Sequence, residues 1–286
     1  MIAMIKRNLR VFLRDRPSVF FSLLSVFIII GLYALFLGDL MLSSSIFQGR
    51  AGVKWMMDSW LMAGVMAAGS VTTALGAMGL MAEDKERKIN MDFVSSPIGR
   101  GEIVGSYIIS GYIISVLLTF LTGILASLYI LSRGGQLPGL ATAFQIIGLL
   151  LLSGFSSTAL VLFLVSLIQS NTSFSIISTL VGTLIGFLAG VYVPVGQLPS
   201  AVASVVNFIP AAHSAALLRQ TMMAEPISRV FAGAPGELVM DFRRAMGVDL
   251  FIGGAPISSQ ISLLVLAGSG ALFFALATLS LKRKAK

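Results

Sequence analysis

The chain has 286 residues, of which 56% are hydrophobic and 11% are charged, and its formal net charge is +8. Soluble domains carry about 25% charged residues, and here the deficit extends over the whole length, which predicts an all-α integral membrane protein rather than a soluble domain with an anchor. The absence of cysteine and the single histidine exclude disulfides, thiolate chemistry and a multi-histidine metal site. In so apolar a chain, the excess of lysine and arginine over acidic residues indicates basic side chains next to the membrane rather than a nucleic-acid-binding surface.

Residues 1–17 predict an amphipathic helix lying on the membrane surface and ended by Pro17. Its apolar face would consist of Ile2, Ile5, Leu9 and Phe12, and its other faces of Lys6, Arg7, Arg10 and Arg14. A frayed, solvated terminus is the alternative. A signal peptide is excluded because the apolar run that follows is too long and lacks a small-residue cleavage site.

Six uncharged apolar runs have the length of roughly 20 residues that a membrane-spanning helix needs. These runs cover residues 18–37, 59–81, 104–131, 141–168, 173–193 and 259–281. The second run contains Gly64, Ala68 and Gly76 at or near the small-xxx-small spacing that lets helices approach closely. We therefore expect this second helix to face protein rather than lipid.

Residues 194–258 differ from the spans because several prolines divide them. The stretches 199–208 and 211–223 are apolar but too short to cross a bilayer, which predicts a re-entrant helical hairpin. Charged residues return after Leu218, so the rest of this region is expected to form a small water-facing cap.

The polar stretch 82–103 carries nine charged residues between two apolar runs and must therefore lie in water. Glu83 and Arg87 form a favourable i,i+4 pair, so the first half is expected to form an exposed helix. Apolar Ile89, Phe93 and Val94 would give this helix one adhesive face. An ordinary solvated loop is the alternative.

The distribution of lysine and arginine predicts the orientation. Thirteen of these residues fall in the N-terminal segment, the 82–103 stretch and the C-terminal tail, and seven fall on the opposite side. Because the richer side faces the cytoplasm, we expect both termini and the 82–103 stretch to be cytoplasmic and the cap to be outside.

The residues that the predicted spans lack argue against several classes of function. The predicted spans contain no charged residue, which argues against an ion-driven carrier, and no Walker A loop is present, so this chain does not bind ATP in that way. We interpret His213 as an interfacial residue, and Glu237, Asp241 and Asp249 as a solvated cap rather than a carboxylate site. A membrane enzyme is disfavoured because the spans lack catalytic polar residues.

A bundle of membrane helices without an ATP site or intramembrane charges is passive or takes its energy from a partner protein.

The chain resembles the type-2 permeases of ABC transporters, which include bacterial exporters of drugs and polysaccharides. The resemblance is most specific at residues 83–87 and 96–103, an acidic-Arg element followed by Ser-Pro and a basic residue. A departure is Ile89-Asn90, where a Gly-Thr pair is common. In that family this loop is the coupling helix that sits in a cleft of the ATPase subunit. The resemblance implies ATPase-coupling residues at Glu83, Asp84, Lys85, Glu86, Arg87, Lys88, Ser96, Pro97 and Arg100.

A second likeness covers residues 190–194, 198–199, 207–210 and 217–219, which resemble the fifth span and the outer re-entrant helices of the family. It implies an outer gate at Pro194, Pro199, Asn207, Pro210 and Arg219. It also implies two permease copies, identical or paralogous, in a bacterial cytoplasmic membrane. ATP and Mg²⁺ would bind to a separate ATPase subunit, and no cofactor to this chain.

The cargo implied by the resemblance is amphiphilic: a drug, an antimicrobial or a lipid-like molecule. Two alternatives stay open. One is a subunit that exports polysaccharide or lipid-linked glycan, and the other is a membrane sensor or assembly subunit that does not transport.

Overall fold

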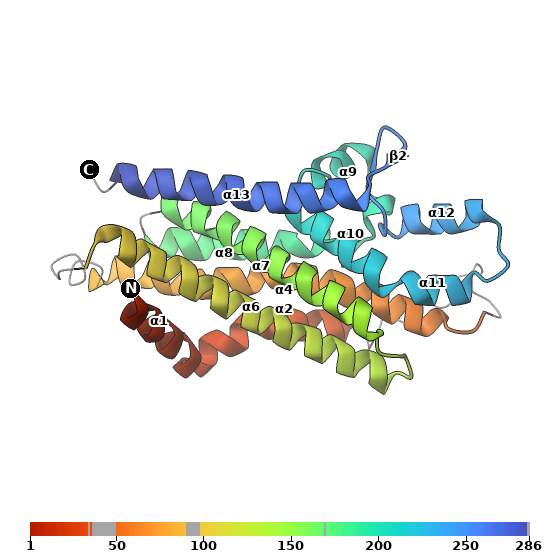
Figure 1. Cartoon of the computed structure of the whole chain (residues 1–286), viewed down its shortest axis with the longest axis horizontal. Coiled ribbons are helices and arrows are strands. Elements are labelled where there is room, and N and C mark those ends of the chain that lie inside the picture. The colour runs from red at the N-terminus through yellow and green to blue at the C-terminus, as the bar shows by residue number, and fades with distance from the viewer. Residues whose placement is uncertain (34, 36–49, 90–97, 169, 285–286) are drawn as a thin grey trace.

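A computed structural model of the chain describes residues 1–33, 35, 50–89, 98–168 and 170–284. The structure is an all-α bundle whose long helices run roughly along one axis (Figure 1). The elements are α1 (Ile2–Arg14), α2 (Arg16–Leu32), α4 (Val53–Glu86), α6 (Arg100–Ser132), α7 (Leu140–Leu167), α8 (Asn171–Leu188), η3 (Val195–Gln197), α9 (Ser200–Val206), α10 (Pro210–Met222), α11 (Ala224–Val230), α12 (Gly236–Ala245), β1 (Phe251–Ile252), β2 (Ala255–Pro256) and α13 (Ser259–Lys284).

Among the described residues, α4, α6, α7, α8 and α13 are each long and apolar enough to cross a bilayer. Two further helix pairs meet this criterion only together and are sharply bent: α1 with α2, by 70°, and α9 with α10, by 89°. The second bend lies where the sequence predicts a re-entrant hairpin. The end of the predicted first span, beyond Tyr33, falls largely outside the described residues.

Helix α4 is the central element of the bundle, in contact with α2, α6, α7, α8 and α10. Its side chains are buried along most of its length, which confirms the prediction that this span faces protein. The close contacts occur at its glycines: a Cβ added to Gly76 would lie 2.1 Å from the Ser22 hydroxyl oxygen of α2. At 1.5 Å per residue, α4 is about 50 Å long, more than the roughly 30 Å of a hydrocarbon core.

Hydroxyl groups join α4 and α7 to their neighbours inside the bundle. Ser70 of α4 and Ser157 of α7 are 2.9 Å apart, and Thr73 of α4 lies 3.1 Å from Thr119 of α6. A third pair, Ser153 of α7 and Ser214 of α10, is separated by 2.6 Å. Such interhelical hydrogen bonds contribute about 0.6 kcal/mol each in membrane proteins, and together they fix the rotation of α4 within the bundle.

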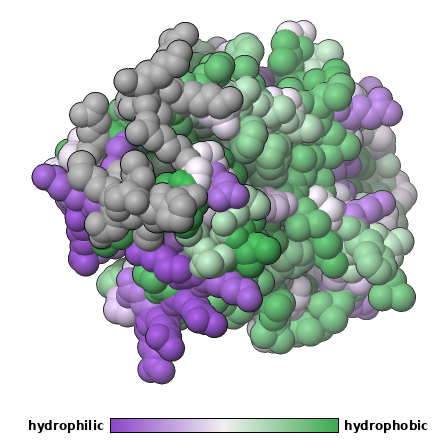
Figure 2. All heavy atoms as spheres, turned by 60° about the vertical axis from the view of Figure 1, so that its left-hand side comes forward, coloured by the Kyte–Doolittle hydropathy of each residue, from purple (hydrophilic) through white to green (hydrophobic). Residues whose placement is uncertain are grey.

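The two ends of the bundle differ in character. The start of α1 and the ends of α4 and α13 lie at one end, and α9, α11, α12 and the β1–β2 hairpin lie at the other, which we call the cap end (Figure 1). Figure 2 brings the end with α1 forward and shows hydrophilic residues gathered along one edge, next to a broad hydrophobic surface. This is the polarity expected where a membrane-spanning bundle emerges into water.

Several boundaries differ from the sequence prediction. Helix α4 runs beyond residues 59–81 at both ends, so Lys54 and Asp58 are helical instead of belonging to a loop. Helix α8 ends at Leu188 instead of Val193, because Gly190 adopts a left-handed conformation with φ of +64°. The cap also contains a short antiparallel hairpin, β1–β2, that the all-helical expectation did not include.

Candidate functional site at the two ends of α4

The charged residues that follow the second span belong to α4 itself. The helix continues to Glu86, and Lys88 then adopts the left-handed conformation, with φ of +59°, that ends many helices. The expected i,i+4 pair is present, with Arg87 Nη2 at 2.7 Å from Glu83 Oε1. Since this sequence contains no helix breaker, the expected exposed helix is instead the last part of a spanning helix, with Glu86, Arg87 and Lys88 exposed.

Asp84, by contrast, points into the protein and is 2% exposed. Its carboxylate forms an ion pair with Arg7 of α1, and Arg7 Nη2 donates a 3.0 Å hydrogen bond to Oδ1. The hydroxyl of Tyr107 in α6 donates to Oδ2 at 2.5 Å. The expectation that the whole charged stretch lies in water is therefore wrong for Asp84, which links three helices.

The same contacts change the interpretation of α1. Its buried face consists of Met4, Asn8 and Phe12, whereas Ile2, expected on the apolar face, is 68% exposed. Asn8 is fully buried because its side-chain amide donates to Ser110 Oγ of α6 at 3.1 Å. The hydrogen bond to Asp84 raises the pKa of Arg7 above that of a free arginine. Helix α1 thus docks on the bundle through polar as well as apolar contacts.

Lys85 extends this linkage to α7. Its Nζ donates a 2.6 Å hydrogen bond to the carbonyl oxygen of Ile168, the residue that caps α7. A lysine near a helix C-terminus is favoured by the helix dipole. Of the other predicted coupling residues, Arg100 is the first residue of α6, and Ser96 and Pro97 lie outside the described residues.

At the cap end, Arg219 of α10 is a buried cation, 1% exposed. Its Nη2 donates to the carbonyl oxygens of Ala189 and Gly190, at 2.9 and 2.8 Å, just after α8. Its Nη1 donates to the Gly247 carbonyl, at 3.3 Å, just after α12. Because helix C-termini carry partial negative charge, the two helix ends compensate the charge of Arg219.

The indole of Trp60, on α4, closes this site from the bundle side. The Arg219 guanidinium carbon lies 4.8 Å from the centroid of the indole, a cation–π distance. Trp60 Nε1 in turn donates to the carbonyl oxygen of Met246 at 2.7 Å. Arg219 and Trp60 together connect α4 and α10 with the ends of α8 and α12, and we call this pair with its carbonyl acceptors the arginine latch.

Glycine at position 64 makes room for the latch. A Cβ on Gly64 would lie 2.8 Å from Arg219 Nη2 and 2.9 Å from Val191 Cγ2, closer than side chains approach one another. The small-residue pattern noted in the sequence of this helix therefore serves the approach of a charged side chain as well as helix packing.

The other predicted outer residues lie at element boundaries of the same end. Pro194 and Pro199 immediately precede η3 and α9, Pro210 opens α10, and Asn207 ends α9 and donates from Nδ2 to the Phe251 carbonyl at 2.7 Å. His213 is 1% exposed, not interfacial. Its Nε2 is 2.7 Å from the Asn207 carbonyl oxygen and its Nδ1 is 3.1 Å from Ser262 Oγ of α13.

The acidic residues of the cap do not form a site. Glu237 and Asp241 are exposed, and Asp249 is bound by Arg243, whose Nε lies 2.6 Å from Asp249 Oδ2. Within the described ranges, no group of three acidic or histidine side chains is placed to hold a metal ion.

Sequence reasoning missed Arg7 as a partner of Asp84, and it missed Tyr107 and Trp60 altogether. In the sequence, Arg7 lies 77 positions from Asp84, and Tyr107 lies 23 positions from it. No local spacing connects such residues. A carboxylate beside the end of an apolar span is the one signal that could have suggested a buried partner.

Comparison with known proteins identifies two similarities. The family model of the ABC-2 family transporter proteins matches residues 43–279. A stretch of 79 residues is 38% identical to Nodulation protein J of Rhizobium leguminosarum bv. viciae and covers 28% of this chain and 30% of that protein. A match of the same length is 35% identical to Nodulation protein J of Rhizobium meliloti (strain 1021). The similarity thus spans about a third of the length of these curated relatives.

Proposed function

The chain belongs to the ABC-2 transporter family, and from this membership we propose that it is the membrane permease subunit of an ATP-driven exporter. ATP and Mg²⁺ bind to a separate ATPase subunit, which supplies the energy that this chain has no Walker A loop to obtain. Two permease copies, identical or paralogous, form the transport unit in a bacterial cytoplasmic membrane. Both termini and the charged end of α4 face the cytoplasm, as the lysine and arginine distribution favours.

The observation that supports this proposal most directly is the course of α4. One continuous helix ends at the exposed charges Glu86, Arg87 and Lys88 and carries, far along its length, the indole of Trp60 in the arginine latch. A helix buried among its neighbours transmits displacement along its axis because packed cores do not deform continuously.

We propose that the ATPase subunit grips this charged end. When ATP closes the ATPase dimer, the charged ends of α4 in the two permease copies are pushed toward each other. Helices α1, α6 and α7 move with α4, because contacts of Arg7, Tyr107 and Lys85 connect them to it. At the cap end, movement of Trp60 relative to Arg219 shifts α10 and the end of α12. The arginine latch thereby opens or closes the exit for the cargo.

The proposed cargo is an amphiphile such as a drug, an antimicrobial or a lipid-like molecule. Helix α8 exposes large apolar side chains over its length, including Ile176, Leu180 and Leu184. A passage bordered by such a surface suits a molecule with an apolar part better than a small ion. Export of a polysaccharide or lipid-linked glycan is the alternative, and a non-transporting sensor or assembly role is a further one.

The test begins with affinity purification of the chain from its native membrane. We expect an ATPase with a Walker A loop to purify with it, and the reconstituted complex to hydrolyse ATP faster in the presence of an amphiphile. Stimulation by glycans alone would favour the alternative cargo. Recovery of the chain without any nucleotide hydrolase, under conditions that preserve its fold, would contradict the proposed function.

A further inference from the structure

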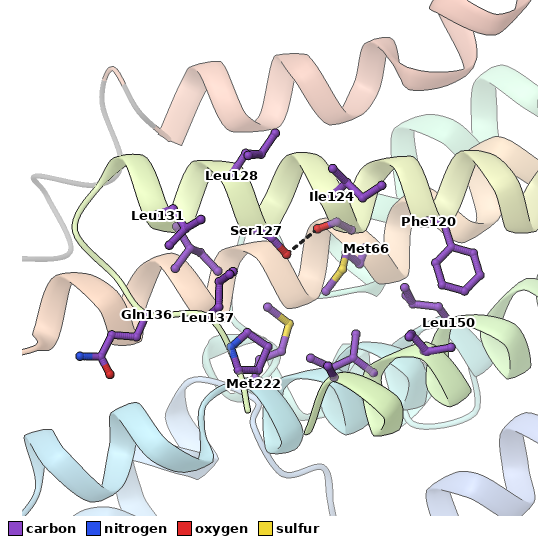
Figure 3. A pocket seen from close by; sticks show the side chains of 16 residues that line it. Met66, Phe120, Ile124, Ser127, Leu128, Leu131, Gln136, Leu137, Leu150 and Met222 are labelled. Carbon is purple, nitrogen blue, oxygen red and sulfur yellow. Dashed lines mark hydrogen bonds between the residues drawn. The ribbon is translucent and has the colours of Figure 1, made fainter. Parts of the chain in front are cut away.

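A groove of about 410 Å³ lies between α6 and α7 toward the cap end (Figure 3). Its walls come from the last part of α6, the first part of α7 and the turn between them, and Met66 of α4 and Met222 of α10 complete it. Five of the residues that line it have large, exposed hydrophobic side chains: Ile124, Leu128, Leu131, Leu137 and Ile147. This groove lies apart from both the charged end of α4 and the arginine latch.

The interior of the groove requires no polar ligand. Ser127, the hydroxyl residue among the lining residues, already donates to the carbonyl oxygen of Gly123 at 2.9 Å. Gln136 points away from the groove (Figure 3), and its Oε1 accepts a 3.0 Å hydrogen bond from Arg229. Met66 and Met222 are flexible and polarisable, so they adapt to an apolar chain of varying shape.

The length of the groove matches one leaflet of a membrane. At 1.5 Å per residue, the lining stretch of α6 from Phe120 to Leu131 is about 16 Å long, close to half of the roughly 30 Å hydrocarbon core. The groove ends where the chain leaves the span, at the turn that contains Gln136 and Pro138. With this turn placed at headgroup level, the groove reaches toward the bilayer midplane.

The width of the groove selects the occupant. Spread over this length, 410 Å³ corresponds to a mean cross-section of about 25 Å². A whole helix, about 10 Å in diameter, is wider than this, so a second copy would enter the groove only with individual side chains. One alkyl chain, whose carbons approach their neighbours at about 4 Å, has a cross-section of about 20 Å² and fits.

We propose that this groove binds one acyl chain of a bilayer lipid from the leaflet at the cap end, as a resident lipid rather than as cargo. The headgroup lies beside Gln136 and Arg229, and the chain runs along α6 to Met66. Since Met222 ends α10, which carries Arg219, the bound chain supports the helix on which the arginine latch is built. The proposal depends on the proposed function only for naming this leaflet the outer one.

The test uses the chain alone in phosphatidylcholine vesicles that contain a phospholipid with a diazirine in one acyl chain. After photolysis, the labelled residues are mapped by mass spectrometry. Met66 is the informative position, because it is 1% exposed and a lipid on the outer surface does not reach it. We expect label on Met66 as well as on the exposed residue Ile124.

Filling the groove provides the variant. Gly123 lines it, and a Cβ there makes only ordinary contacts, with Leu150 at 3.4 Å and Met66 at 3.5 Å. Gly123→Leu displaces about two methylene groups of the chain and should lower the Met66 label about tenfold. The matched control is Gly148→Leu, on an exposed position of α7 with nothing within 4 Å, which should leave the label unchanged. Ala143→Phe, also lining the groove, replaces Gly123→Leu if that variant does not fold.

Two results would overturn the proposal. One is label on the exposed faces of α6 and α7 with none on Met66, which means that lipid covers the groove without entering it. The other is equal Met66 label in Gly123→Leu and Gly148→Leu. Neither result bears on the proposed function, because the assay contains no ATPase and measures no transport.

Discussion

The carboxylate of Asp84 near the end of α4 forms an ion pair with the guanidinium of Arg7 in α1, 77 positions earlier in the chain. Asp84 has a 3% exposed side chain and Arg7 a 30% exposed one, so the acid is buried and the base reaches it from the surface. The neighbouring residues Glu86, Arg87 and Lys88 stay exposed. Adjacent charges on one helix end thus divide into an internal anchor and a free surface.

The first prediction is that Asp84→Ala destabilises the protein by about 3 kcal/mol, the lower end of the range for breaking a buried ion pair, because Arg7 keeps access to water. The loss arises because Arg7 and the Tyr107 hydroxyl both lose the Asp84 carboxylate as an acceptor. It is measured by thermal unfolding in detergent. Glu83→Ala, one position away and half exposed, is the control and should change stability by no more than about 0.5 kcal/mol.

A double-mutant cycle checks the assignment of the partner. If Arg7 acts through Asp84, the variant Arg7→Ala/Asp84→Ala should be about as stable as Asp84→Ala alone, because the ion pair is already lost when the second change is made. Strictly additive losses would show that the two side chains stabilise the protein independently.

The second prediction concerns docking of the ATPase subunit. The change Glu86→Ala/Arg87→Ala should weaken association with the ATPase at least about tenfold, which corresponds to about 1.4 kcal/mol, and should abolish transport while membrane insertion is retained. Affinity purification measures association with the ATPase, and export by the reconstituted complex measures transport. The reason is that both side chains are exposed at the end of α4 and neither holds the bundle together.

The matched control lies at the opposite end. Glu225 and Arg229 form an exposed i,i+4 pair, with Arg229 Nη2 at 2.5 Å from Glu225 Oε1. Glu225→Ala/Arg229→Ala therefore removes an acid and a base from a helix surface without touching the proposed docking end. Equal loss of ATPase association in both double variants would contradict docking at α4.

The long hydrophobic helices could be predicted because hydropathy and length act locally: a run without charge either spans a bilayer or is buried. The small residues of α4, Gly64 and Gly76 among them, likewise predicted its burial correctly. What could not be predicted depends on contacts between distant residues. Asn8 and Arg7 look solvated in sequence, and their burial is decided by Ser110 and Asp84 on other helices.

The arginine latch shows a second limit of sequence reasoning. Arg219 was predicted at the outer gate by resemblance alone, and its acceptors are backbone carbonyls, which every residue has. Only the fold brings the ends of α8 and α12 to the same guanidinium. The premature end of α8 is part of the same arrangement, because the turn at Gly190 aims its carbonyl at Arg219.

The third prediction tests this latch. Arg219→Lys retains the charge but offers one compact ammonium where a planar guanidinium donates to two helix ends, so we expect a loss of about 2–3 kcal/mol in stability and reduced transport. Thermal unfolding, substrate-stimulated ATP hydrolysis and transport by the reconstituted complex are the measurements. Arg244→Lys is the control: this arginine is exposed and stacks on Phe251, 4.8 Å from its ring centroid. Its replacement should cost no more than about 0.5 kcal/mol.

Two results for Arg219→Lys would carry different meanings. Wild-type stability together with wild-type coupling would show that the guanidinium geometry is dispensable. A stable protein that hydrolyses ATP but does not transport would place the latch in the gate itself, since the ATPase end of α4 would then be intact.

The last prediction concerns the turn that ends α4 at Lys88, the described non-glycine residue with a positive φ, +59°. A side chain in the left-handed conformation costs roughly 1–2 kcal/mol that glycine does not incur. Lys88→Gly should therefore stabilise the protein by up to about 1 kcal/mol, after allowing for the greater freedom of glycine in the unfolded chain. Lys88→Val should destabilise it, because β-branched residues tolerate this conformation least. Thermal unfolding of both variants measures the difference. Lys54→Gly, in the first turn of α4 where the backbone is right-handed, is the control and should lose stability by less than about 1 kcal/mol. If Lys88→Gly proved less stable than Lys88→Val, the helix would not end in a left-handed turn at this position, and the boundary between the buried anchor at Asp84 and the exposed docking surface would have to be set differently.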